Sequence, residues 1–471
     1  MNVQRLGSQP LRARAPVLPV VVGGLALLAA PVAWADAPAT GGASPQASAL
    51  AAPADTPAPA QVWAIHGQTT VTEQGTIAFP SPYRGTNSLD PGTRGRETVD
   101  VTLAAGWRPW RGAELWIESE VDQGFGLDNT EGAAGFPSGE AYKVGAVDPY
   151  IRLPRAFLRQ TIDLGGEEQF VDADITQLAG HQTANRLVFT VGKFGVTDVF
   201  DTNKYAHDPR GDFLNWTLVD TGTFDYAADA WGYTVGAAAE WYQGRWTLRA
   251  GAFDLSIVPN SEHLDWTFGQ FQLIGEVEER HDLFGHPGKI AVTGFLTRGR
   301  MGKFDDAIAL AEETGQAANI ALVRDYRSRT GLSVNLEQEL TSEVGLFARA
   351  GVAGGDVEPY EFTDVDNTVA AGLSFNGKPW GRSADTIGLG GAINDISKIH
   401  TEYLAAGGLG ILVGDGKLPH AAPEQLIETY YSAALAPWLT LTFDAQLIVN
   451  PAYDAERGPA PVLAARLHAQ F

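Results

Sequence analysis

The sequence contains no cysteine among its 471 residues. Disulfide bonds and thiolate metal ligands are therefore excluded, and we expect backbone pairing and side-chain packing to stabilise the fold. Positive charge is also scarce, since 33 Lys and Arg residues stand against 56 Asp and Glu residues, for a net charge of −23. A chain this acidic repels phosphate backbones, which argues against nucleic acid as a partner.

A long apolar run occurs only near the amino end. There, Arg5, Arg12 and Arg14 precede PVLPVVVGGLALLAAPVAWA, which ends in small residues suited to cleavage and is interrupted by prolines. This pattern predicts a secretory signal peptide over residues 1–35 rather than a membrane anchor. The Ala/Pro-rich residues 36–60 are predicted to be a disordered leader. A single folded domain is then expected over residues 61–471, with no further run long enough for a membrane helix.

Motifs that would indicate catalysis or metal binding are missing as well. No GxSxG sequence occurs. In GGLGILVGDGK, Ile411 replaces the first glycine of a phosphate-binding loop, and Leu418 stands where Ser or Thr is required. His281 and His286 lack the spacing of zinc ligands, and residues 356–366 lack the glycine and terminal glutamate of an EF-hand. We therefore predict no enzyme, no cofactor and no metal site, and keep an outer-membrane hydrolase as the least favoured alternative.

The chain does contain many short runs in which apolar and polar residues alternate. In WLTLTFDAQLIVN, for example, one face carries apolar side chains and the other carries Thr440, Thr442, Asp444 and Gln446. Period-two alternation predicts β-strands with one apolar face. About fifteen such runs occur, and we place a sixteenth at residues 155–163 because membrane barrels have even strand numbers. Both a soluble sandwich and an outer-membrane barrel are built from such strands.

The connections between the runs distinguish these two architectures. Short and long connections alternate strictly along the chain, which is typical of a barrel with short periplasmic turns and long extracellular loops. The short ones are 108–112, 242–245, 339–343, 376–385 and 436–438, and the long ones are 73–96, 122–154, 195–230, 255–267, 299–327, 353–367, 394–423 and 450–461. We therefore predict an all-β, transmembrane, antiparallel up-and-down barrel of about 16 strands around an aqueous channel, which makes transport the default function.

Aromatic residues gather at the predicted short turns. We expect them to form a girdle at the periplasmic membrane interface; they are Trp107, Trp110, Trp241, Trp246, Trp380 and Trp438. The final alternating run, PVLAARLHAQF, places Phe471 on its apolar face. We expect this last strand to pair with the first, to place Phe471 in the girdle, and to serve as the element that the barrel-assembly machinery contacts.

Several ordered stretches resemble a known family over most of the chain. They are SPYRGTNSL (81–89), AGFPSGEAYK (134–143), GKFGVTDVFDTNKYAHDPRGDFLNW (192–216), FDYAADAWGYT (224–234), YLAAGGLGILVGDG (403–416) and NPAYDAERGP (450–459), and they are similar to the carbohydrate-selective porins of the OprB type. The resemblance implies a sixteen-stranded channel in the cell outer membrane for facilitated diffusion of sugars, especially glucose-like ones. A general or other-solute porin is the alternative. Expected partners are sugars, outer-membrane lipid and lipopolysaccharide, with a possible homotrimer.

A sugar-selective pore needs a constriction that offers hydrogen bonds and aromatic faces without tight binding. Arg152, Arg155 and Arg159 recur at helical spacing in YIRLPRAFLRQ, into which the 122–154 connection leads, so a helix there would present one cationic face. We expect Glu114, Glu118 and Glu120 to stand opposite that face, creating a transverse field. In the alternative, these arginines pair with loop carboxylates or with lipopolysaccharide phosphates.

The 195–230 connection is the second candidate for the constriction. It combines polar groups with an aromatic residue in a composition that suits a sugar, and the candidate residues are Asp201, Asn203, Asp208, Arg210 and Trp216. In the alternative, this is a structural loop whose Asp and Asn residues stabilise turns and whose small core contains Trp216.

Overall fold

The computed structural model describes residues 60–93, 95–141, 145–361 and 363–471. These residues belong to the second of two units into which the chain divides, residues 38–471. The predicted signal peptide, 1–35, lies outside the described residues, and so does the predicted leader, 36–60, except for its last residue.

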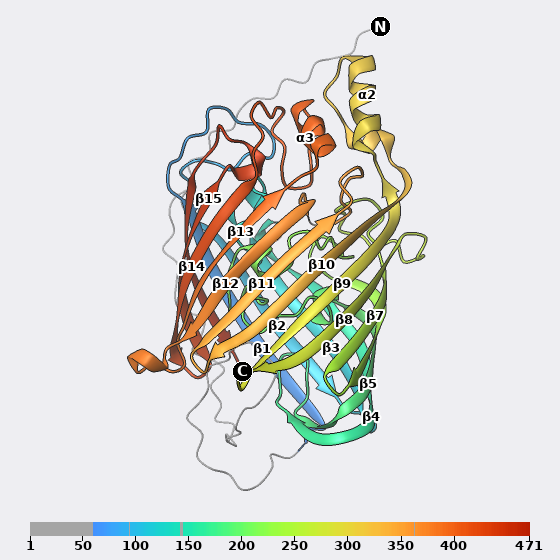
Figure 1. Cartoon of the computed structure of the whole chain (residues 1–471), viewed down its shortest axis with the longest axis vertical. Helices are drawn as coiled ribbons and strands as arrows, with labels where there is room; N and C mark the ends of the chain where they lie inside the picture. The colour runs from blue at the N-terminus through green and yellow to red at the C-terminus, as the bar shows by residue number, and fades with distance from the viewer. Residues whose placement is uncertain (1–59, 94, 142–144, 362) are drawn as a thin grey trace. The chain divides into compact units, whose positions relative to one another are not determined.

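Sixteen antiparallel strands form one closed barrel, which confirms the predicted fold (Figure 1). Each strand pairs with its neighbours in the sequence, and β1 pairs with β16, so the sheet has no free edge. The strands are β1 (Trp63–Thr76), β2 (Arg96–Trp107), β3 (Ala113–Gly124), β4 (Ala146–Val171), β5 (Gly180–Phe194), β6 (Thr234–Gln243), β7 (Trp246–Asp254), β8 (Phe271–Leu283), β9 (His286–Met301), β10 (Asp325–Thr341), β11 (Val344–Ala353), β12 (Asn367–Asn376), β13 (Thr386–Asp395), β14 (Glu424–Ala436), β15 (Leu439–Val449) and β16 (Ala460–Gln470).

The apolar face of the strands points outward. In β15, Phe443 is 58% exposed, whereas its neighbour Asp444 faces the barrel interior and is 5% exposed. β16 likewise exposes apolar side chains and buries a charged one, since Leu463 and Leu467 are exposed and Arg466 is buried. A soluble sandwich would bury these leucines, so the exposed apolar face decides in favour of a barrel whose outer surface contacts hydrocarbon.

Short turns gather at the end of the barrel that carries the chain terminus Phe471, and long connections gather at the other end (Figure 1). Within the long connections lie the helices α1 (Trp216–Val219), α2 (Phe304–Thr314) and α3 (Lys398–Ala405), together with the short 3-10 turns η1 (Leu127–Thr130), η2 (Val196–Asp198), η3 (Ile320–Val323) and η5 (Pro451–Tyr453), whereas η4 (Lys378–Trp380) lies in a short turn. No helix in the described ranges is both long and apolar enough to cross a membrane.

The strand predicted at 155–163 exists but is much longer, and the predicted helix is wrong. Arg152, Arg155 and Arg159 all lie on strand β4. The pairing register with β3 shifts by one residue between Arg152 and Arg155, which is a β-bulge. Because of the extra residue, Arg152 and Arg155 project from the same face of the strand although they are three residues apart. Arg159 lies four residues further along, so the three arginines have the spacing expected of a helix. Pro154, which cannot donate a ladder hydrogen bond, lies inside the bulge.

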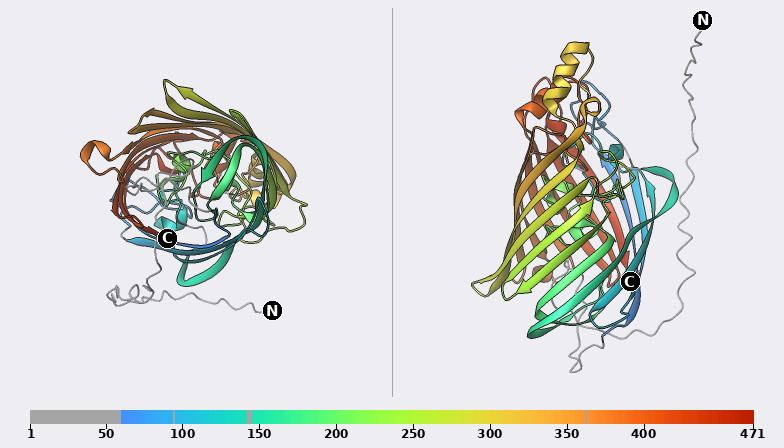
Figure 2. Two further views of the ribbon diagram at one scale, coloured as in Figure 1. Left: turned by 90° about the horizontal axis from the view of Figure 1, so that it is seen from below. Right: turned by 90° about the vertical axis from the view of Figure 1, so that its right-hand side faces the viewer.

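Much of the barrel interior is filled by connections that fold inward (Figure 2, left). The largest, residues 195–233, packs Phe213 against inward-facing Phe347 and Tyr430, with ring centroids 5.3 Å and 5.0 Å apart. Gly390 on β13 leaves room for the Phe213 ring, because a Cβ there would lie 3.1 Å from it. The barrel therefore combines a lipid-facing exterior with a partly packed interior, which limits the space available to a channel.

Candidate functional site

Two neighbouring strands bring the predicted arginines and glutamates together. Register pairs join Glu114 to Arg159, Glu118 to Arg155 and Glu120 to Arg152 across β3 and β4. Arg152 forms ion pairs with both Glu120 and Asp122, and Arg155 Nη1 lies 2.6 Å from Glu118 Oε1. The expected transverse field is therefore wrong in its geometry, because the acids are on the adjacent strand rather than across the lumen.

Arg155 also joins the barrel wall to the inward loop 195–233. Its Nε and Nη2 atoms donate to the two carboxylate oxygens of Asp198 at 2.8 Å and 2.7 Å, a bidentate pair. Burial opposes ionisation of Asp198, but the Arg155 guanidinium outweighs it and lowers the pKa of this carboxyl. Pairing with a loop carboxylate was the alternative considered for these arginines, and Arg155 makes such a pair.

Arg210 of the same loop reaches acids on three other segments. Its guanidinium lies 3.4 Å from Glu120 on β3, 3.6 Å from Asp100 on β2 and 3.5 Å from Glu140 in the 125–145 connection. Asp208 accepts the backbone N–H of Arg210 at 2.9 Å. Although burial opposes it, Arg210 lowers the pKa of the Asp208 carboxyl. Two predicted loop residues, Asp208 and Arg210, thus join the group on β3 and β4.

Aromatic rings border this group, and sequence reasoning missed them. The guanidinium carbons of Arg152 and Arg155 lie 5.1 Å and 4.9 Å from the centroid of the Tyr233 ring. Trp231 donates through Nε1 to the Tyr150 hydroxyl at 2.9 Å, and Arg152 lies 6.0 Å from the Trp231 ring. We call Arg152, Arg155, Arg210, Glu118, Glu120 and Asp122 the arginine cluster.

The arginine side chains of the arginine cluster are partly exposed inside the barrel. The side chains of Arg152, Arg155 and Arg210 are 10%, 14% and 13% exposed, while Glu118 and Glu120 are essentially buried. Since these side chains belong to inward faces or to an inward loop, the accessible surface borders interior space. The arrangement offers hydrogen-bond donors next to aromatic faces, with the charges already neutralised locally.

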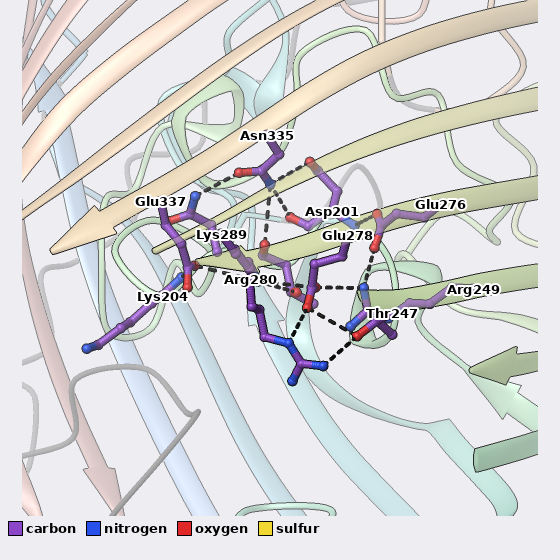
Figure 3. A network of polar contacts seen from close by, with 12 residues as sticks. Asp201, Lys204, Thr247, Arg249, Glu276, Glu278, Arg280, Lys289, Asn335 and Glu337 are labelled. Atoms are coloured by element: carbon purple, nitrogen blue, oxygen red, sulfur yellow. Dashed lines mark hydrogen bonds and ion pairs between the residues drawn. The ribbon is translucent and has the colours of Figure 1, made fainter. Parts of the chain in front are cut away.

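Two other predicted residues, Asp201 and Asn203, lie elsewhere, in a polar network against β8 and β10 (Figure 3). The Asp201 carboxylate accepts from Thr221 N at 2.6 Å and from Asn335 Nδ2 at 2.7 Å, and the Asp201 backbone N–H donates to Glu276 at 2.9 Å. Asn203 donates to the Asn335 side chain at 2.7 Å.

Trp216 is buried away from the arginine cluster. Its ring stacks on Phe136, with centroids 5.4 Å apart and planes inclined by 14°. Asn215 caps the short helix α1 by accepting from Thr217 N at 3.1 Å. Asp201, Asn203 and Trp216 thus have the buried contacts of the structural alternative, and Asp208 stabilises a turn by accepting the Arg210 N–H, whereas the Arg210 side chain reaches acids on β2 and β3.

A short segment folds back against the inner wall near the periplasmic end of the barrel. The β4–β5 hairpin extends beyond the ends of β3 and β6, and its connection, residues 172–179, folds back to the interior face. Arg159 Nη1 donates to Thr176 O at 3.0 Å, Leu178 N donates to Glu114 Oε2 at 3.3 Å, and Leu178 is 1% exposed. Glu114 and Arg159 therefore hold this segment, which we call the mouth segment. Sequence reasoning gave no signal for it.

The aromatic residues predicted for the girdle are exposed at the ends of strands joined by short turns. All are at least 40% exposed: Trp107, Trp110, Trp241, Trp246, Trp380, Trp438 and Phe471. Outward exposure beside short turns is the placement that a membrane-interface girdle requires. The girdle itself stays a prediction.

Comparison with known proteins gives a family and a fold. The family model described as "Carbohydrate-selective porin, OprB family" matches residues 86–471. The high-pH structure of Pseudomonas putida OprB matches with a TM-score of 0.66 at 16% identity, covering 87% of this chain and 94% of that chain. The outer membrane channel DcaP of Acinetobacter baumannii gives a TM-score of 0.48 at 10% identity, covering 87% and 97%. A search of curated proteins finds no match.

Proposed function

The chain belongs to the carbohydrate-selective porin family, OprB, and from this premise we propose that it carries out facilitated diffusion of carbohydrates, specifically monosaccharides such as glucose. The barrel is an outer-membrane protein, and its family and fold point to a channel rather than an enzyme. The choice of monosaccharides follows what the family resemblance implies, and the chemistry of the arginine cluster supports a neutral solute with many hydroxyl groups.

The observation that carries the proposal is the meeting of arginines, carboxylates and aromatic rings on one part of the inner wall. Sugar hydroxyls can exchange hydrogen bonds with water for bonds with Arg152, Arg155 and Arg210, while an apolar sugar face contacts Tyr233 or Trp231. Because each arginine already has a carboxylate partner, no single unpaired charge holds the solute tightly. A weak, neutral site of this kind lets a sugar enter and also leave.

We further propose a route for the sugar. It runs past the exposed parts of the Arg152, Arg155 and Arg210 side chains, then beside Arg159 and Glu114 at the mouth segment, and so reaches the periplasm. The partial exposure of these side chains and the polar backbone of the mouth segment support this path. Asp201, Asn203 and Trp216 lie off the route and hold the loop in position.

Sugar block of ion current in planar bilayers tests the proposal. Arg210→Gln and Trp231→Ala should each weaken block by glucose about tenfold, because each removes one partner worth about 1.4 kcal/mol. Arg245→Gln is the matched control, since Arg245 pairs with Glu279 and its side chain is 65% exposed, far from the arginine cluster in the β6–β7 turn. Equal block in all three variants would remove the arginine cluster from the sugar path.

Liposome swelling separates a sugar channel from a general diffusion porin. Neutral sugars should enter faster than charged solutes of similar size, and Arg210→Gln should reduce that difference. Rates that depend on solute size alone would favour the general porin. A homotrimer and contacts with the barrel-assembly machinery belong to the same proposal; the mass of the detergent-solubilised protein tests the trimer.

A further inference from the structure

Two arginines face outward at the extracellular ends of the strands. Arg298 and Arg300 alternate along β9 with Thr297, Gly299 and Met301, whose positions face the interior; Thr297 and Met301 are 0% exposed. Both arginines therefore project from the outer, lipid-facing side of the barrel. The connection that follows, 302–324, is one of the long ones and contains α2, which places these residues at the extracellular end.

Neither arginine has a carboxylate within ion-pair distance in the described part of the chain. Arg298 Nη1 contacts only Ser328 Oγ, at 3.4 Å, and its guanidinium carbon lies 5.9 Å from the Tyr326 ring. Cations close by in the sequence are paired: Arg324 lies 2.7 Å from Glu358, and Arg327 lies 2.7 Å from Asp306. The chain has 56 acidic residues and a net charge of −23, yet two neighbouring outward-facing arginines have no acidic partner among the residues described. We therefore expect an anion from outside the chain to pair with them.

Exposed aromatic side chains lie in the connection that leads into β8, the strand that pairs with β9. In the 255–270 connection, Trp266 is 68% exposed and Phe268 is 45% exposed, and both have left-handed backbone angles (φ 59° and 55°) that non-glycine residues seldom adopt. The connection is tied to β9, because Gln270 Oε1 accepts the Arg300 N–H at 2.7 Å and Phe271 pairs with Arg298 in register.

This connection projects outside the ring of strands next to the arginines. Figures 1 and 2 show it as the yellow-green loop beside the strands β7 to β9. Large aromatic surfaces held outward are unfavourable in water and favourable at the level of lipid headgroups, where Trp and Tyr are enriched. Aromatic rings and unpaired guanidinium groups thus share one outer surface at one membrane interface.

We propose that Arg298 and Arg300, with Trp266 and Tyr326, form a docking surface for a phosphate-bearing glycolipid of the outer leaflet, namely the lipid A part of lipopolysaccharide. Each guanidinium pairs with phosphate oxygens, which suit its planar fork of donors. The aromatic rings contact the sugar headgroup and the upper acyl chains. The docking surface is on the outside of the barrel, so it is separate from the sugar path.

A lipid-binding titration tests this docking surface. The probe is bisphosphorylated lipid A added to the purified mature protein in phosphatidylcholine vesicles, and the comparison lipid is the same molecule without its phosphates. The double variant Arg298→Gln/Arg300→Gln should bind bisphosphorylated lipid A about 25-fold more weakly, because each arginine near an anionic lipid surface contributes about a factor of five. The dephosphorylated lipid should bind equally weakly to both proteins.

Arg84→Gln is the matched control. Arg84 is an exposed arginine of the 77–95 connection, at the same end of the barrel, but it already lies 3.2 Å from Asp90. Its replacement should leave lipid A affinity unchanged, and Trp266→Ala should weaken binding of both lipids. Because the substituted arginines are on the surface, heat-modifiable gel mobility should show that the double variant is folded.

Two outcomes would overturn the docking surface: equal affinity of wild type and double variant for bisphosphorylated lipid A, or no preference of wild type for the phosphorylated lipid. Equal affinity together with loss of oligomers in the double variant would assign the surface to a second copy of the chain. Sugar-driven liposome swelling should be unchanged in the double variant, so failure of this inference and failure of the sugar channel are distinguishable.

Discussion

The ring of Phe471 lies directly over Gly67, and the two residues exchange both backbone hydrogen bonds. Phe471 N donates to Gly67 O, and Gly67 N donates to Phe471 O, each at 2.9 Å. A Cβ on Gly67 would lie 2.4 Å from Phe471 Cζ, so the absence of a side chain at 67 makes room for the ring. The last residue of the chain thus completes the contact between β16 and β1 that closes the barrel.

Replacing either member of this pair should impair barrel closure. We expect Phe471→Ala to lower the stability of the folded barrel by about 1 kcal/mol, since the ring is only partly buried. Gly67→Val should cost about as much, because its side chain displaces the ring from this contact. The folded fraction is measured by heat-modifiable gel mobility after refolding into vesicles, with outward-facing Leu467→Ala as the control. Equal refolding of Gly67→Val and wild type would contradict this account.

Replacing Arg349 should release the inward loop from the wall. This buried guanidinium donates to Leu218 O at 2.6 Å and to Ala206 O at 2.7 Å, and it lies 3.6 Å from the Asp201 carboxylate. Arg349→Met leaves Asp201 without its cation, which should destabilise the fold by about 3–5 kcal/mol. A displaced loop widens the interior, so single-channel conductance should also rise. Wild-type conductance together with wild-type stability would be evidence against this anchor.

The buried carboxyl of Asp220 should make stability depend on pH. Burial, followed by the nearby Asp201 carboxylate, raises the pKa of Asp220 to about 7. The folded protein therefore keeps a proton that the unfolded chain releases near pH 4, so this group lowers stability as pH rises from about 4 to 7. The full effect is about 4 kcal/mol, from roughly three pKa units at 1.4 kcal/mol each.

Asp220→Asn removes this titration while keeping the side-chain shape. The variant should be more stable than wild type at pH 8 and should show a shallower slope between pH 5 and pH 8. Urea unfolding in detergent at several pH values measures both effects. An unchanged slope would assign the pH dependence to other buried carboxyls, such as Asp212, whose pKa burial and Asp208 raise to about 6.

Shortening the mouth segment should widen the periplasmic exit. Replacing residues 172–179 by an Asn-Gly turn removes the contacts with Arg159 and Glu114, so we expect a higher single-channel conductance. Sugar block should persist, because the arginine cluster lies further inside. If conductance stays at the wild-type value, the mouth segment does not restrict the channel; if block disappears, the mouth segment rather than the arginine cluster carries the selectivity.

Strand number, strand order and the outward apolar face followed from local patterns. The alternation along β15 and the contrast between short and long connections predicted the barrel without knowledge of any tertiary contact. A strand with period-two alternation must expose its apolar face when it is in lipid. The β4 arginines show where such reasoning fails. Their spacing fits a helix, and only pairing with β3 shows that a bulge produces it.

The sequence by itself determined a closed barrel of sixteen strands, since the alternation of side chains and the loop lengths are local properties of the chain. Only the tertiary structure decided which residues meet inside it. Arg210 reaches Glu120, and Phe213 reaches Tyr430, across separations of 90 and more than 200 positions, because an inward loop is free to pack against any part of the wall. The register and the side-chain contacts that select one packing exist only after the barrel has closed.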